Sequence, residues 1–135
     1  AAINPANKDP EHYWAEPYVL PGNVDGPDSP HHGRAGWTWY TGAAQWLHRV
    51  ITHWVLGVRP EWDGLRIDPC LPAGWTRARQ IRPWRGATYD VQIERVDGLR
   101  PGEVQITLNG QSHGGPVLPL PDRPGVRHVV HVRCG

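Results

Sequence analysis

Proline and glycine interrupt this chain so often that only one long helix can form in it. The sequence holds 15 prolines and 16 glycines among its 135 residues. Proline inside a helix removes a backbone hydrogen bond, and glycine weakens the helix. The apolar residues between these breaks still recur at regular spacings, which argues against disorder. The chain is long enough for one domain with a real core, or for a small domain and a piece of another.

The one long helix is expected over residues 43–56. Apolar residues recur there at spacings of three and four and form a single stripe: Ala43, Trp46, Leu47, Val50, Ile51 and Trp54. Gly57 supplies a left-handed stop, and Pro60 follows it. Because Trp46 and Trp54 lie on this stripe, we expect them to be core residues. One helix cannot bury so wide a stripe by itself, so it needs packing partners. These partners are either the sheet that follows or helices that precede this chain.

Strands are expected after this helix. Alternating apolar and polar residues predict strands at 64–69, 78–84, 87–96, 103–108, 117–120 and 126–132. Turns are expected at Arg85-Gly86 and Asn109-Gly110. Many short strands separated by turns are typical of an antiparallel β-sandwich. We expect the joint between the helix and this sandwich to be filled by Trp62, Trp75 and Trp84.

Residues 1–35 are expected to form a long loop. Asp9-Pro10 has the pattern of a cap followed by a first-turn proline, which predicts a helical turn. Residues 18–20 are the only stretch there that is typical of a strand. A loop of this length is unusual in a compact domain unless it lines a functional site.

Charge and cysteine content exclude several classes of protein. Fourteen basic residues nearly balance 13 acidic ones, so the formal net charge is +1 and we expect neither nucleic acid nor a membrane as partner. No apolar run spans a bilayer, and residues 1–10 lack the apolar core of a signal peptide. Cys70 and Cys134 can pair, but we favour reduced thiols in a cytoplasmic protein. The eight histidines lack ligand spacing, so no metal site is expected.

Thr41 and Gly42 come at the start of the expected helix. A helix start presents unpaired backbone N–H groups and the positive end of the macrodipole, so it attracts anions. A hydroxyl and a glycine there let a phosphate approach the backbone. Just ahead, Trp37, Trp39 and Tyr40 offer flat faces on which sugar rings can stack. The alternatives are a threonine that only caps a helix and, for Trp37 and Trp39, packing in the core.

Several motifs follow one another in an order that is specific when taken together. They are Glu16-Pro17-Tyr18-Val19, Gly26-Pro27-Asp28-Ser29-Pro30, residues 33–42 and residues 64–72. Arg85-Gly86-Ala87-Thr88-Tyr89 and Leu108-Asn109-Gly110 come after them. The series resembles the C-terminal part of glycoside hydrolase family 94. That family comprises inverting phosphorylases of β-linked glucosides such as cellobiose, chitobiose and β-1,2-glucans.

The resemblance implies a fold and a division into domains. Members of that family have an N-terminal β-sandwich, an (α/α)6 barrel and a C-terminal, jelly-roll-like sandwich. Residues 1–60 are then expected to hold the last active-site loop and helix of the barrel, and residues 61–135 the closing sandwich. The chain contains no methionine, as expected of a fragment whose N-terminal part is missing. The resemblance also suggests that the parent enzyme is a homodimer.

The resemblance implies a reaction as well. Inorganic phosphate attacks the anomeric carbon of a β-linked glucoside or oligosaccharide while an aspartic acid protonates the departing oxygen, which gives α-glucose 1-phosphate. Such a glycosyltransferase-type phosphorylase uses phosphate as co-substrate and needs no other cofactor. Thr41 and Gly42 align with the family's phosphate-holding pair. The acid is expected upstream, so we assign no catalytic residue here and expect the isolated chain to be inactive.

Further residues are candidates for contact with the substrate. Where cellobiose-type members place a glutamine that touches the glucosyl unit, this chain has Gly22 or Asn23. His32 and Arg34 can supply positive charge, although solvated loop residues are the alternative. The full set of candidates is Tyr18, Gly22, Asn23, His32, Arg34 and Trp37. A carbohydrate-binding sandwich without catalysis and a purely structural module are the competing functions.

Overall fold

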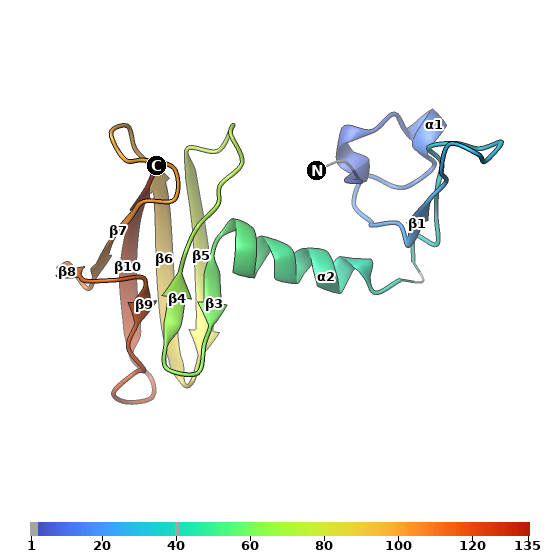
Figure 1. The fold of residues 1–135 in the computed structure, drawn as a ribbon. Helices are drawn as coiled ribbons and strands as arrows, with labels where there is room; N and C mark the ends of the chain where they lie inside the picture. The colour runs from blue at the N-terminus through green and yellow to red at the C-terminus, as the bar shows by residue number, and fades with distance from the viewer. Residues whose placement is uncertain (1–2, 40) are drawn as a thin grey trace. The chain divides into compact units, whose positions relative to one another are not determined.

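The computed structural model describes residues 3–39 and 41–135, and the chain divides into two units, residues 1–48 and 49–135 (Figure 1). Tyr40, one of the predicted stacking residues, lies outside the described residues. Each unit has its own hydrophobic cluster. None of the helices that the structure describes is long and apolar enough to cross a membrane.

The first unit begins with short elements held by local caps. A 3-10 turn, η1 (Pro5–Asn7), precedes α1 (Pro10–Tyr13). The carboxylate of Asp9 accepts the backbone N–H of Glu11 at 3.0 Å, which confirms the predicted helix start. The strand expected at residues 18–20 is wrong, because Pro17 and Pro21 flank it and Val19 N–H instead closes a turn onto the carbonyl of Glu16. The strands of this unit are β1 (Asn23–Val24) and β2 (Ala35–Gly36), paired antiparallel.

The predicted long helix forms, but its hydrogen bonding changes along its length. It begins as α2 (Ala43–Val50) and continues as a π-helical turn, η2 (Ile51–Val55). The N–H of Leu56 bonds to the carbonyl of Ile51 at 2.8 Å, the wider spacing of a π turn. Gly57 follows with a φ of +68°, the left-handed stop that the sequence predicts.

The apolar stripe of this helix is not buried within the chain. Trp46 is 67% exposed and Trp54 is 57% exposed, so the expectation that both are core residues is wrong for this chain. Within the second unit, the sheets leave the Trp54 ring more than half exposed. Instead, Arg59 lies over the Trp54 ring, 4.3 Å from its centroid. A helix cannot bury a stripe against itself, and the described residues leave both rings more than half exposed.

The second unit is a sandwich of two sheets (Figure 1). The three-stranded sheet has the order β3-β4-β9, with strands β3 (Val58–Pro60), β4 (Leu65–Ile67) and β9 (Val117–Leu118). The five-stranded sheet has the order β5-β6-β10-β7-β8. Its strands are β5 (Arg77–Trp84), β6 (Ala87–Arg95), β7 (Val104–Leu108), β8 (Gln111–His113) and β10 (Arg127–Cys134). Buried side chains of both sheets meet in one core, among them Leu65, Ile67, Tyr89, Val91, Leu118 and Val130.

The sandwich differs from the antiparallel expectation at one pairing. Strands β6 and β10 run parallel, with Arg127 opposite Thr88 and Cys134 opposite Arg95. The connection between β6 and β10 runs through β7, β8 and β9 and returns the chain to the end of the sheet at which β6 begins. Strand β10 therefore runs in the same direction as β6. All other strand pairs are antiparallel.

The predicted roles of the other tryptophans hold only in part. Trp62 is 91% exposed and Trp75 is also exposed, so neither fills a joint. Trp84 is half-buried and packs against the sandwich core, with its ring centroid 6.0 Å from that of Tyr89. Both cysteines are free thiols, Cys70 exposed and Cys134 buried.

Candidate functional site

The hairpin of the first unit brings three predicted site residues, Gly22, Asn23 and Trp37, to one place. The N–H of Gly22 bonds to the carbonyl of Gly36 at 2.9 Å, and Asn23 pairs with Gly36 in the strand register. Trp37 follows Gly36 with a φ of +55°. This pairing explains why segments 22–24 and 35–37, well separated in sequence, lie next to each other.

Gly22 also lies against Thr41. A Cβ built on Gly22 would be 3.0 Å from the Cβ of Trp37 and 3.3 Å from both Cβ and Oγ1 of Thr41. Contacts this close leave almost no room for a side chain, so glycine permits the hairpin to approach the start of α2. Gly22, Trp37 and Thr41, all predicted from the sequence, therefore form one cluster.

Thr41 and Gly42 lie at the start of α2 in helix-capping geometry. The hydroxyl oxygen of Thr41 accepts the N–H of Ala43 at 3.1 Å, and the carbonyl of Gly42 accepts the N–H of Trp46 at 3.2 Å. A Cβ built on Gly42 would meet nothing within 4 Å, so the backbone is open there. A hydroxyl that accepts one hydrogen bond can still donate its proton. The corner can therefore cap the helix and donate to an anion at the same time.

Exposed aromatic side chains accompany this cluster. Tyr18 is 77% exposed and Trp39 is 73% exposed, with ring centroids 6.4 Å apart and planes inclined at 58°. The indole N–H of Trp39 donates to a carboxylate oxygen of Glu16 at 2.9 Å, and this bond lowers the pKa of Glu16. Trp37 is exposed as well. The alternative that Trp37 and Trp39 pack in the core is therefore wrong.

His32 and Arg34 lie in a separate groove of the first unit. The carboxylate of Asp25 accepts the hydroxyl of Ser29 at 3.2 Å, and that hydroxyl oxygen accepts the N–H of His31 at 3.0 Å. The resulting loop lines a groove of about 490 Å³ together with Glu11, His12, Trp14 and Pro30. Among the described residues that line it, Thr41 and Gly42 do not appear.

Trp14 belongs to this groove and was missed from the sequence. It ends α1 with a φ of +59°, is exposed, and has the Arg34 guanidinium 5.1 Å from its ring centroid. The sequence pattern that could have indicated Trp14 is the short helix predicted after Asp9-Pro10. The residue that follows a helix of one turn leaves the helical conformation, and its side chain can then point away from the helix. The groove joins an aromatic face to a cation.

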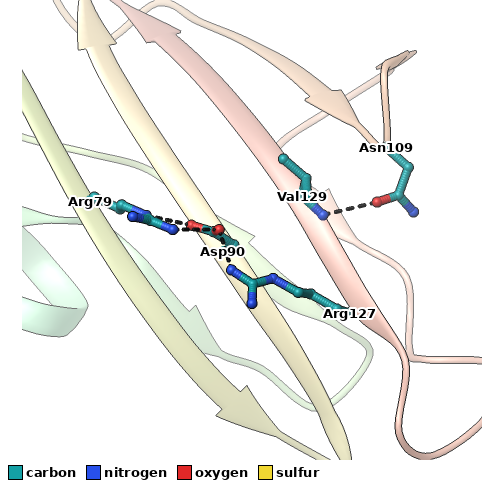
Figure 2. A network of polar contacts seen from close by, with 5 residues as sticks. All are labelled: Arg79, Asp90, Asn109, Arg127 and Val129. Carbon is teal, nitrogen blue, oxygen red and sulfur yellow. Dashed lines mark hydrogen bonds and ion pairs between the residues drawn. The ribbon is translucent and has the colours of Figure 1, made fainter.

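The most buried carboxylate of the second unit is not a proton donor. Asp90 is 3% exposed. It accepts from Nε and Nη2 of Arg79, each at 2.8 Å, and from Nη2 of Arg127 at 2.7 Å (Figure 2). Hydrogen bonds from Arg79 and then Arg127 hold the pKa of Asp90 well below its usual range. An acid held ionised in this way cannot protonate a leaving group, so Asp90 is structural.

Comparison with known proteins gives this site a context. Residues 1–57 match the family model described as the catalytic domain of the glycosyl hydrolase 94 superfamily. N,N'-diacetylchitobiose phosphorylase of Vibrio proteolyticus is 40% identical over 120 residues, 87% of this chain and 15% of that protein. Solabiose phosphorylase of Paenibacillus borealis is 33% identical over 132 residues, 98% of this chain and 16% of that protein.

A third relative is named as a synthase and not as a phosphorylase. Cyclic beta-(1,2)-glucan synthase NdvB of Rhizobium meliloti (strain 1021) is 36% identical over 114 residues, 82% of this chain and 4% of that protein. The chain thus spans about a sixth or less of the length of these curated relatives. Together with the match over residues 1–57, these similarities show that the chain belongs to the glycosyl hydrolase 94 superfamily.

Proposed function

We propose that this chain is part of a glycoside phosphorylase and contributes the phosphate-holding corner of its active site. The observation that carries the proposal is the cluster of Thr41 with Gly22 and Trp37 at the start of α2. Helix starts bind anions through their N–H groups and dipole. The phosphorylase names of two relatives support phosphate as the ligand.

In the proposed reaction, phosphate is the nucleophile. One of its oxygens forms a bond to the anomeric carbon of a β-linked glucosyl unit, from the face opposite the glycosidic oxygen. The bond from the anomeric carbon to that oxygen breaks, and an acid elsewhere in the enzyme gives it a proton. The product is α-glucose 1-phosphate. A second carboxylate that activates water, as in inverting hydrolases, is not needed because phosphate is already an anionic nucleophile.

The parts assigned to this chain are binding and orientation. The Thr41 hydroxyl donates to a phosphate oxygen while it accepts from Ala43, and the open backbone at Gly42 lets the phosphate approach. Tyr18, Trp37 and Trp39 provide exposed ring faces for the sugar. We assign no general acid to this chain, so we expect it to release no sugar phosphate from cellobiose on its own.

The test uses the full enzyme that contains this chain, with Thr41 replaced by valine and, as the matched control, by serine. Thr41→Val removes the hydroxyl and keeps the shape. We expect it to raise the KM for phosphate at least about tenfold, the value of one lost charge-assisted hydrogen bond. Thr41→Ser keeps the hydroxyl and should stay close to the parent enzyme. If Thr41→Val lowers only the melting temperature and leaves the KM for phosphate unchanged, Thr41 is a helix cap and nothing more.

A binding module without catalysis is the second candidate, and the exposure of Tyr18, Trp37 and Trp39 favours it. Titration of the chain with cellobiose or chitobiose, followed by tryptophan fluorescence, tests whether the chain binds sugar by itself, and the KM for phosphate of Thr41→Val in the full enzyme separates the two candidates. Under this second candidate the fluorescence changes saturably, and Thr41→Val leaves the change intact. An unchanged fluorescence at millimolar sugar counts against it.

A further inference from the structure

The outer face of the five-stranded sheet carries a polar groove that the proposed reaction does not use. Side chains of β6 alternate between the core and this face: Tyr89, Val91 and Ile93 are buried in the core, and Gln92 and Glu94 lie on the other side. The groove has a volume of about 650 Å³. Its polar lining comes from three neighbouring strands: Arg77, Arg79, Gln92, Glu94, His131 and Arg133.

The strand register explains why these side chains converge. Arg77 on β5 lies opposite Glu94 on β6, and Glu94 lies opposite Arg133 on β10. In the next row, Gln92 lies between Arg79 and His131. Directly opposed residues on one face of a sheet hold their side chains within contact distance. The two adjacent rows therefore build one continuous polar surface.

Positive charge dominates this surface. Three arginines and one glutamate line the groove, and His131 adds charge when it is protonated. The ion pair between Arg77 and Glu94 is long, at 3.4 Å, and exposed, so it neutralises little. Arg133 donates to the amide oxygen of Gln105 at 3.4 Å, a neutral partner. Arg79 is paired with the Asp90 carboxylate, which Arg127 shares. Even with Asp90 and Glu94 counted, the arginines outnumber the carboxylates on this face, so its net charge is positive.

One of the arginines is fixed in place before any ligand arrives. The buried Asp90 carboxylate holds Arg79 by two hydrogen bonds and also binds Arg127 (Figure 2). These bonds use Nε and Nη2 of Arg79, and a guanidinium has further N–H donors. Fixing a side chain in advance lowers the conformational entropy lost on binding. The Nε and Nη2 edge is occupied by Asp90, so a ligand carboxylate or phosphate would bind the remaining N–H donors on Nη1 and Nη2.

We propose that this groove binds an acidic saccharide, one whose sugar units carry carboxylate groups. The carboxylate pairs with Arg79 and Arg133, and the sugar hydroxyls bond with the amide of Gln92 and the carboxylate of Glu94. The inference that the ligand is a saccharide rests on the proposed function. The inference that the ligand is acidic rests on the arginines that line the groove. The site lies in residues 49–135 and contains none of the residues assigned to phosphate.

Isothermal titration of the 135-residue chain tests the proposal with three probes at one ionic strength: tetragalacturonate, cellotetraose and inorganic phosphate. We expect saturable binding of tetragalacturonate and at least tenfold weaker binding of the other two. Equal binding of cellotetraose that Arg133→Glu also weakens overturns the preference for an acidic ligand. Equal binding of phosphate that Arg133→Glu also weakens overturns the assignment of a saccharide. No binding of tetragalacturonate at millimolar concentration overturns the site.

A pair of charge-reversal variants locates the site. Arg133→Glu places a negative charge in the groove, whereas Arg123→Glu makes the same change on the exposed loop before β10, outside the groove lining. We expect Arg133→Glu to weaken tetragalacturonate binding at least tenfold and Arg123→Glu to weaken it less than twofold. If both variants lose the same affinity for tetragalacturonate, the binding depends only on the overall charge of the chain, and the proposed site is wrong. Because the groove lining, Arg133 included, contains none of the residues assigned to phosphate, failure of this binding test leaves the phosphate KM result of Thr41→Val unaffected.

Discussion

Asp90 is the residue at which burial and charge oppose each other most directly. Its carboxylate is almost fully buried, yet it stays ionised because Arg79 and Arg127 surround it. Both arginines keep more than half of their side chains exposed, at 56% and 58%. The cost of removing their charge from water is therefore small, and the burial cost falls mainly on the carboxylate.

The first prediction concerns the pH dependence that follows from this arrangement. The pKa of Asp90 is lower in the folded chain than in the unfolded one, so the stabilisation is present at neutral pH and is lost as the pH falls below about 4. We expect Asp90→Asn to lower the melting temperature at pH 7 by roughly 5 °C. The difference in melting temperature between the parent chain and Asp90→Asn should decrease steadily from pH 4 to pH 2, as measured by circular dichroism. A difference that stays constant down to pH 2 would show that the ion pairs do not account for it.

The candidate site residues were named from the sequence on unequal grounds. The Thr41 prediction rested on a backbone requirement, a hydroxyl at a helix start, whereas Gly22 was named as the residue in place of a glutamine; the structure brings the two into contact. His32 and Arg34 lack such a requirement, and the structure places them in another groove. Trp14 was missed because its exposure depends on where α1 ends, a matter of one residue.

Among the secondary-structure elements, the end of the long helix is the most constrained. Gly57 has a φ of +68°, and a Cβ there would be 2.1 Å from the backbone carbonyl carbon and oxygen of Asp68. The N–H of Asp68 bonds to the carbonyl of Gly57 at 2.8 Å. The helix therefore enters the sandwich through a backbone contact that excludes any side chain.

The second prediction uses this contact. We expect Gly57→Ala to lower the free energy of unfolding by at least about 3 kcal/mol, because backbone strain and a clash with immovable main chain add. Gly98 also has a positive φ, of +91°, but a Cβ there meets nothing within 4 Å. Gly98→Ala should therefore cost only about 1 kcal/mol. Urea denaturation of both variants measures the difference, and equal losses would mean that the contact with Asp68 relaxes freely.

Strands and turns were predictable to different degrees. Arg85-Gly86 and Asn109-Gly110 form the expected turns, with positive φ at all four residues, since few residue pairs tolerate that conformation. Strand direction was not predictable. The alternation of β6 and β10 shows which side chains face the core, but it is the same for parallel and antiparallel pairing. The two-residue strands β1 and β2 are too short to carry any period.

For the whole molecule, the decisive feature is that apolar burial is unequal between the two units. The larger cluster draws all its buried members from residues 58–134 and joins both sheets. The cluster of the first unit consists of Tyr13, Ala15 and Ala35. The sequence predicted the sandwich because each strand carries its own alternation. It did not predict that Trp46 and Trp54 are exposed, because an apolar stripe on a helix does not show what the helix packs against.

The third prediction is that residues 49–135 fold without the first unit. All buried members of the larger cluster lie within these residues. The π-helical turn η2 also contacts the five-stranded sheet, with His53 Nε2 3.3 Å from Arg82 Nη2. We expect a polypeptide of residues 49–135 to unfold cooperatively, with a melting temperature within about 3 °C of that of the full chain. Hydrogen exchange of the full chain should show strong protection in β6 and β10 and weak protection in residues 3–39. A polypeptide of residues 49–135 that lacks a cooperative transition would mean that the sandwich depends on the first unit, and the larger cluster would then not be a sufficient core.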